Sequence, residues 1–166
     1  ATFATKVVSQ ASYQKGHLAA LTEDAWKGTE SIDHEELRDT VAKLQERCGP
    51  DRLDAVDFII VEGFRAFHDF ELVKRMDLLL WVELDRETCH ARRQASASPV
   101  PESVFLINLW PTHVEYQLLL SGPDGKISRA RDRSVVLDGR QPPEDLLEAA
   151  LAEVRRRFPM LGQTGG

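Results

Sequence analysis

The sequence is poor in cysteine and has neither an excess of basic residues nor a long apolar run. Two cysteines, Cys48 and Cys89, are too few for a disulfide framework, so we expect a reducing compartment, the cytoplasm or an organelle matrix such as the mitochondrion. The net charge of −6 argues against a nucleic-acid partner. No run reaches the roughly 18 apolar residues that a membrane helix needs, so we expect no transmembrane segment.

Several local signatures of catalysis are absent as well. The five histidines show no zinc-ligand spacing with either cysteine, so we predict no metal site. No serine lies in a nucleophile-elbow pattern. A phosphate loop of the form GxxxxGKS or GxxxxGKT does not occur, and the stretch from Gly122 to Ser128 has the wrong spacing for one. No signal peptide follows Ala1, so we expect a processed chain or one whose start is missing.

What the sequence does contain is ordinary for a globular protein. Its 166 residues are 42% hydrophobic and 29% charged, which predicts one folded domain, over residues 1–161. Residues 162–166 are expected to form a flexible tail. Four apolar runs predict strands, at residues 6–10, 56–63, 78–84 and 134–139. Nearly continuous apolar runs are typical of parallel strands that are covered on both faces.

Helical patterns lie between these strands. Apolar spacing, a proline near the start of a segment and a Gly-Pro stop predict helices at residues 32–46, 70–75, 86–94, 110–120 and 143–158. The alternation of strands and helices indicates an α/β fold with a parallel sheet. Residues 95–101 interrupt the pattern and predict a surface loop, where lids are often found.

A few residues stand where chemistry could take place. Glu62 ends an apolar strand, and ligands of open α/β sheets bind at that edge, so its carboxylate could orient a Mg²⁺-bound water or a substrate hydroxyl. Arg92 and Arg93 could clamp phosphates. For Glu62, the alternative is a strand that happens to end in glutamate. For Arg92 and Arg93, the alternative is a solvated helix face. Trp110, followed by Pro111, is more often a core residue than a ligand platform.

The order of the segments resembles the nicotinamide riboside kinase family and, more broadly, the uridine kinase-like P-loop nucleoside kinases. The most specific matches are Glu62-Gly63-Phe64, Trp110-Pro111 and Leu137-Asp138-Gly139, in the family's order and at about its distances. The resemblance covers nearly the whole chain. It implies a three-layer parallel sheet with flanking helices and a small lid, at about residues 92–110.

The chain departs from the family's pattern at residues that the family uses for catalysis. The family's base, an aspartate that takes the proton of the nucleoside 5′-hydroxyl, falls on Ala11, which cannot accept a proton. The tyrosine-aspartate pair that holds base and ribose falls on Trp26-Lys27, and lysine cannot accept hydrogen bonds from ribose hydroxyls. A lid arginine falls on Ser96. Glu62, Arg92 and Arg93 keep the family's residue types.

The missing phosphate loop follows the first strand in the family, in the middle of the sheet. Without that strand, a slot with unpaired backbone would lie between the two most apolar strands, which is costly. We therefore expect a segment upstream of Ala1 that carries the strand and the loop. A partner strand that fills the slot is the alternative. ATP and Mg²⁺ are expected as cofactors only if the upstream loop exists.

Three hypotheses follow. The first is a catalytically degraded nucleoside kinase that acts as a binding or structural accessory subunit among protein partners. The second is an active ATP-dependent nicotinamide riboside or uridine kinase whose phosphate loop lies upstream of Ala1, with Asp24 or Asp33 in place of the base. The third is an unrelated α/β domain whose motifs match by chance.

Overall fold

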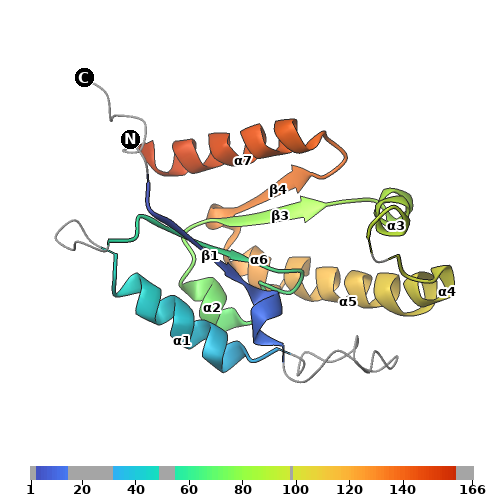
Figure 1. The fold of residues 1–166 in the computed structure, drawn as a ribbon, viewed down its shortest axis with the longest axis horizontal. Coiled ribbons are helices and arrows are strands. Elements are labelled where there is room, and N and C mark those ends of the chain that lie inside the picture. Colours follow the sequence, from blue (N-terminus) through green and yellow to red (C-terminus); the bar gives the residue numbers. More distant parts are fainter. Residues whose placement is uncertain (1–2, 15–31, 49–54, 98, 160–166) are drawn as a thin grey trace. The chain divides into compact units, whose positions relative to one another are not determined.

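The structure is a computed structural model that describes residues 3–14, 32–48, 55–97 and 99–159. It divides into two compact units, Ala1–Arg75 and Met76–Gly166, which are described separately below. In each unit two parallel strands are accompanied by helices, so the predicted α/β class with parallel strands is confirmed (Figure 1). Trp26, Lys27 and the tail at 162–166 lie outside the described residues. The single domain over 1–161 stays a prediction.

The first unit is built on strands β1 (Thr5–Ser9) and β2 (Phe58–Glu62). They pair in parallel from Thr5 opposite Phe58 to Ser9 opposite Glu62, so both end at the same edge. β1 continues directly into the 3-10 turn η1 (Gln10–Tyr13).

Two helices complete this unit, α1 (His34–Gln45) and α2 (Phe70–Lys74). The side chain of Asp33 accepts a hydrogen bond from the backbone N–H of Glu36, which caps the start of α1. Helical spacing places Leu37 and Val41 on one face of α1, and both are buried. The core of the unit is completed by Val8, Val56, Leu72 and Val73.

Strands β3 (Leu79–Glu83) and β4 (Ser134–Asp138) form the parallel pair of the second unit. Leu79 and Leu137 are buried, and helix α7 (Pro143–Arg157) packs against β4. A tight turn follows β4, in which the N–H of Gly139 donates to the carbonyl of Glu83 over 2.8 Å. A Cβ at Gly139 would lie 2.8 Å from that carbonyl oxygen, so only glycine fits this close approach.

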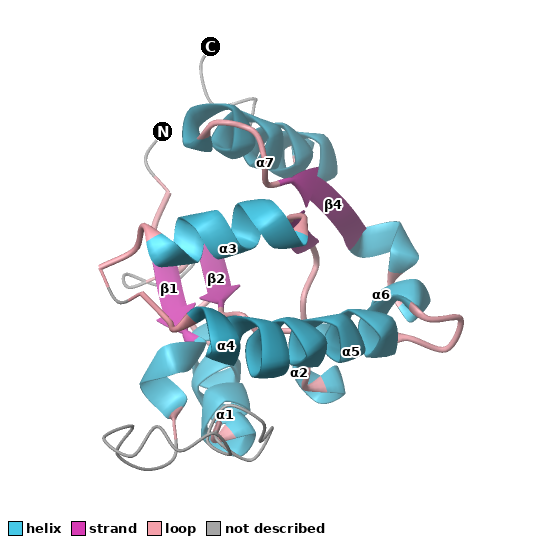
Figure 2. Cartoon of the chain, turned by 90° about the vertical axis from the view of Figure 1, so that its right-hand side faces the viewer, coloured by secondary structure: helices cyan, strands magenta, loops and turns pink. Residues whose placement is uncertain are grey.

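The helices between β3 and β4 begin with α3 (Arg86–Gln94), which the side chain of Asp85 caps. Further along the chain, α4 (Glu102–Val104), the π-helical turn η4 (Phe105–Leu109) and α5 (Trp110–Ser121) follow one another without a break (Figure 2). The short helix α6 (Lys126–Arg129) and the 3-10 turn η5 (Arg131–Arg133) lead into β4.

Most of the elements predicted from the sequence are confirmed. The four strands and five helices are present, and apart from one helix their ends lie within two residues of those expected. The exception is the helix expected to begin at Trp110, which in the structure continues a helical segment that starts at Glu102. Pro111 suggested a start because proline is common there. A proline inside a helix crowds the carbonyl four residues before it, and the wider π turn precedes Pro111 directly.

No helix within the described residues is both long and apolar enough to span a bilayer.

Candidate functional site

The edge at which β1 and β2 end carries two of the residues singled out from the sequence. Glu62 is the last residue of β2 and is exposed. Ala11 lies in η1, directly beyond the end of β1, and is exposed as well. The structure therefore places both residues at the same strand edge of the first unit. This edge offers one carboxylate to a ligand, and at Ala11 it offers a methyl group.

Gln10 was not singled out from the sequence, although its buried side chain packs against the backbone at this edge. Its side chain is only 1% exposed, and its Oε1 accepts a hydrogen bond from the N–H of Arg65 over 3.1 Å. A Cβ at Gly63 would lie 2.5 Å from Cβ of Gln10 and 2.6 Å from its Oε1. Gly63 is therefore required because the glutamine packs against its backbone. The glycine of the Glu-Gly-Phe triplet thus has a packing role in the structure.

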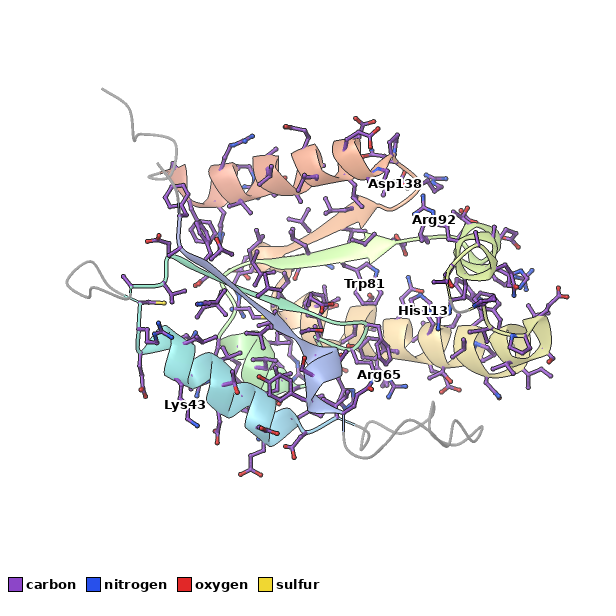
Figure 3. The ribbon with its side chains drawn as sticks, viewed as in Figure 1. Lys43, Arg65, Trp81, Arg92, His113 and Asp138 are labelled. Carbon is purple, nitrogen blue, oxygen red and sulfur yellow. The ribbon has the colours of Figure 1, made fainter. Side chains whose placement is uncertain are left out.

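Arg92, on α3, reaches the corresponding strand edge of the second unit. Its Nη1 donates to the carbonyl oxygen of Gly139 over 2.7 Å, which brings the guanidinium to the end of β4 beside Asp138 (Figure 3). Arg93 behaves differently, because it is half-buried and its Nε is enclosed without a hydrogen-bond partner among the described residues. Arg92 keeps further donors at the strand edge. That the two arginines together clamp phosphates stays a prediction.

Asp138 and Arg140 form a bidentate ion pair after β4. Arg140 donates from Nε and Nη2 to the two carboxylate oxygens, each over 2.9 Å, and its backbone N–H donates to Oδ1 over 3.0 Å. These hydrogen bonds lower the pKa of Asp138 to about 2 and raise the pKa of Arg140. A carboxylate with so low a pKa is a weak base, so Asp138 does not suit proton transfer. In the sequence, this ion pair is indicated by an aspartate and an arginine that lie two residues apart.

Aromatic side chains of α5 pack against one another and against a tryptophan of β3. Trp81 of β3 stacks on His113 of α5, with ring centroids 6.0 Å apart and planes 13° apart (Figure 3). The ring of Trp110 also contacts His113, with a centroid distance of 5.1 Å. Burial lowers the pKa of His113, although the Glu83 carboxylate opposes the shift. Trp110 packs against other rings but is only half-buried, so whether it serves as a core residue or as a ligand platform stays a prediction.

The other titratable groups near β3 have structural roles. Asp85 accepts hydrogen bonds from the N–H and the hydroxyl of Thr88, and these bonds lower its pKa. Glu83 accepts a hydrogen bond from Nε2 of Gln117 over 2.6 Å.

The two cysteines, Cys48 and Cys89, are both free. Burial raises the pKa of the Cys89 thiol.

A metal centre and a nucleotide site each place requirements on the described residues. They contain no group of three or more histidine, cysteine, aspartate or glutamate side chains that could hold a metal ion. Glu62 could orient one water of a hydrated Mg²⁺, and Arg92 could contact a phosphate. Each of these groups offers a single contact within its own unit, whereas a phosphate loop supplies most of the contacts to nucleotide phosphates.

Comparison with known proteins adds no assignment. No protein-family model matches the chain, and no curated protein sequence matches it.

Proposed function

We propose that the chain is a catalytically degraded nucleoside kinase-like protein that acts as a binding or structural accessory subunit of a larger assembly. The observation that carries this proposal is the edge at which β1 and β2 end. Glu62 stands there with an exposed carboxylate, whereas Ala11 occupies the place at which the resemblance puts the catalytic base. The scaffold for positioning a ligand is kept, and the group that would take the proton is missing.

The loss of the base weakens catalysis directly. A positioned general base contributes about 10²- to 10⁴-fold to a rate. Phosphoryl transfer otherwise depends on positioning and electrostatic stabilisation, so each further departure removes another part of the catalyst. The resemblance also places Lys27 where an aspartate would hold the ribose.

We propose a reducing compartment, the cytoplasm or an organelle matrix such as the mitochondrion, and the two free cysteines support this.

A second candidate is an active ATP-dependent nicotinamide riboside or uridine kinase whose phosphate loop lies upstream of Ala1. It is favoured by the exposed carboxylate of Glu62 and by the place of Arg92 at the end of β4. This candidate needs another base, and Asp33 is poorly suited because its carboxylate caps α1. Asp24 lies outside the described residues.

The deciding experiment measures phosphoryl transfer by the full-length protein, including any residues that precede Ala1. Nicotinamide riboside and uridine are each offered with ATP and Mg²⁺, and the nucleoside monophosphate is quantified by chromatography. Calorimetry on the same sample measures ATP binding. We expect turnover at least about 10²-fold below the 1–100 s⁻¹ typical of kinases. Turnover within that range would overturn the proposal and establish the second candidate.

Two variants sharpen the result. Ala11→Asp supplies a carboxylate at the expected position of the base, and Ala11→Asn is its matched control because it has nearly the same shape without basicity. A gain confined to Ala11→Asp would place the missing base at this position. For the second candidate, Asp33→Asn keeps a good helix cap but removes the charge, so lost turnover with unchanged stability would identify Asp33 as the base.

A further inference from the structure

His90 of α3 lies at the contact between that helix and the helical segment that starts at Glu102. Its ring contacts the ring of Phe105 in η4, with centroids 4.6 Å apart and planes 35° apart. Phe105 is buried, whereas His90 is half-buried. The imidazole is therefore fixed at the place where α3 and η4 meet within the second unit.

The side chain of Gln94, one turn further along α3, connects His90 to the chain beyond the helix. Its Nε2 lies 2.6 Å from the carbonyl oxygen of Val100 and 3.2 Å from Nε2 of His90. Val100 is buried and stands two residues before α4. One amide nitrogen therefore ties the last turn of α3 to the segment that leads into α4.

The carbonyl of Val100 determines how the amide and the imidazole are oriented. A carbonyl oxygen can only accept, so the Gln94 atom beside it is the amide nitrogen, which donates. The second hydrogen of this nitrogen is then shared with Nε2 of His90, which must accept it. An imidazole nitrogen accepts only when it carries no proton, so this arrangement requires a neutral His90 with its hydrogen on Nδ1.

Protonation of His90 is incompatible with these two hydrogen bonds. Nε2 of the imidazolium carries a hydrogen, so two donors would face each other at 3.2 Å. If the Gln94 amide turns over, its Oε1 accepts from the imidazolium, but the same oxygen then faces the carbonyl oxygen of Val100 and repels it. A buried carbonyl without a donor is costly, so the segment at Val100 separates from α3 and its carbonyl turns to water.

The charged groups of the elements around His90 are engaged elsewhere or make no bond to it. Those within one turn of it on α3, and those of α4 and η4, are Arg86, Glu87, Arg93 and Glu102. Arg86 and Glu87 pair with each other over 3.1 Å. Among the described residues, His90 forms no ion pair and no hydrogen bond other than that with Gln94. The imidazolium therefore finds its acceptor in Oε1 of Gln94.

We propose that His90 and Gln94 form a pH-sensitive latch, which holds α3 to Val100 while His90 is neutral and releases it when His90 is protonated. The latch is closed at the higher pH and opens as the pH falls through the titration of His90. Release loosens part of the region in which the resemblance implies a lid, at about residues 92–110. The inference concerns the mobility of this segment and does not rest on the proposed function.

The test is NMR of the isotope-labelled 166-residue chain between pH 8 and pH 5. Ring signals of His90 report its protonation, and the carbonyl carbon of Val100 and the side-chain amide of Gln94 report the latch. We expect both latch signals to change along the titration curve of His90.

Amide hydrogen exchange reports the opening of the segment. The N–H of Phe105 donates to the carbonyl of Pro101, directly after Val100. Its protection factor, corrected for the pH dependence of intrinsic exchange, should fall about fivefold in acid, which is the effect of one lost hydrogen bond.

Three variants separate the latch from other effects of acid. His90→Phe keeps a ring against Phe105 but cannot titrate, so protection of the Phe105 amide should no longer depend on pH. Gln94→Leu removes the donor to Val100 and should give the lower protection at every pH. His113→Phe is the matched control, because it removes the other histidine of the second unit that packs against aromatic rings, and the acid effect should persist in it.

Three results would overturn the inference. The first is a constant Val100 carbonyl signal while the ring of His90 titrates. The second is the same acid loosening in His90→Phe as in the unaltered chain, which would assign the effect to another group. The third, which decides the matter even if His90→Phe does not fold, is protection in Gln94→Leu that still falls in acid. All these measurements are made without ATP or nucleoside, so the phosphoryl-transfer assay tests the proposed function separately.

Discussion

Replacement of Asp69 by alanine tests how the first unit holds its helices together. Asp69 is buried and caps α2, because its Oδ1 accepts hydrogen bonds from the N–H groups of Glu71 and Leu72 over 2.9 and 3.3 Å. Its Oδ2 accepts a hydrogen bond from Nη1 of Arg38 over 2.5 Å, which ties α2 to α1. One carboxylate therefore serves two helices.

The magnitude follows from these two roles. Loss of an N-cap costs about 1 kcal/mol of unfolding free energy. The ion pair contributes about 0.5–1 kcal/mol more, since the Arg38 side chain is 33% exposed and can return to water when its partner is removed. Asp69→Ala should therefore lower the free energy of unfolding by about 2 kcal/mol. Asp69→Asn keeps the cap and should lose only the part due to the ion pair.

The assay is urea unfolding followed by circular dichroism, with Arg38→Met completing a double-mutant cycle. We expect a coupling energy of about 0.5–1 kcal/mol between Arg38 and Asp69. For a chain of this size the alanine variant should melt about 4–8 °C lower. Equal losses for Asp69→Ala and Asp69→Asn would refute the capping argument, and zero coupling would refute the argument for the ion pair.

Three further predictions concern the second unit. Gly139→Ala should destabilise the chain by about 1–3 kcal/mol in urea unfolding, because the added methyl would meet a backbone oxygen at 2.8 Å. Arg140→Gln should raise the pKa of Asp138 from about 2 towards 3.8 in a carboxyl NMR titration; with Arg140 present, the stabilisation is complete above pH 3.8 and is lost as the pH falls through about 2. Glu83→Gln should lower the pKa of His113 further, because the carboxylate raises it. Since the pKa of His113 lies below 6.5, its contribution to stability is present above pH 6.5 and falls as the pH drops, which ring-proton NMR and unfolding curves at several pH values can check.

The strands and the longer helices were predictable because their signals are local and periodic. The run Phe58 to Val61 specifies a strand without reference to any partner. The helix that begins at Glu102 was predicted to start later because Pro111 is a strong local signal for a start. The π turn from Phe105 to Leu109 lies where a proline at position 111 crowds the helix backbone, so Pro111 acts here within a helix and does not mark its start.

The candidate site was predictable at the strand ends and hidden elsewhere. The position of Glu62 at an edge followed from its place after an apolar run. The role of Gln10 depends on its contacts with Gly63 and the N–H of Arg65, which are distant in the sequence. Arg92 looked equivalent to its neighbour Arg93, and only the fold shows which of them reaches Gly139. Contacts between distant residues leave no pattern in a single sequence.

Several carboxylates of the described residues are already engaged in hydrogen bonds or ion pairs, which makes them less suited to act as bases. Asp33 caps a helix, Glu83 accepts a hydrogen bond from a glutamine, and Asp138 is held by Arg140 with a pKa of about 2. The side chain of Glu62 makes no hydrogen bond or ion pair with the described residues and is exposed at a strand end, so its carboxylate oxygens are available to a ligand. A carboxylate with no second base beside it can orient a bound hydroxyl or water but cannot complete a proton relay. The proposed function therefore predicts ligand binding without turnover at this strand edge. If Glu62→Gln weakens ATP binding in the presence of Mg²⁺ while turnover stays absent, the strand edge binds nucleotide without catalysis.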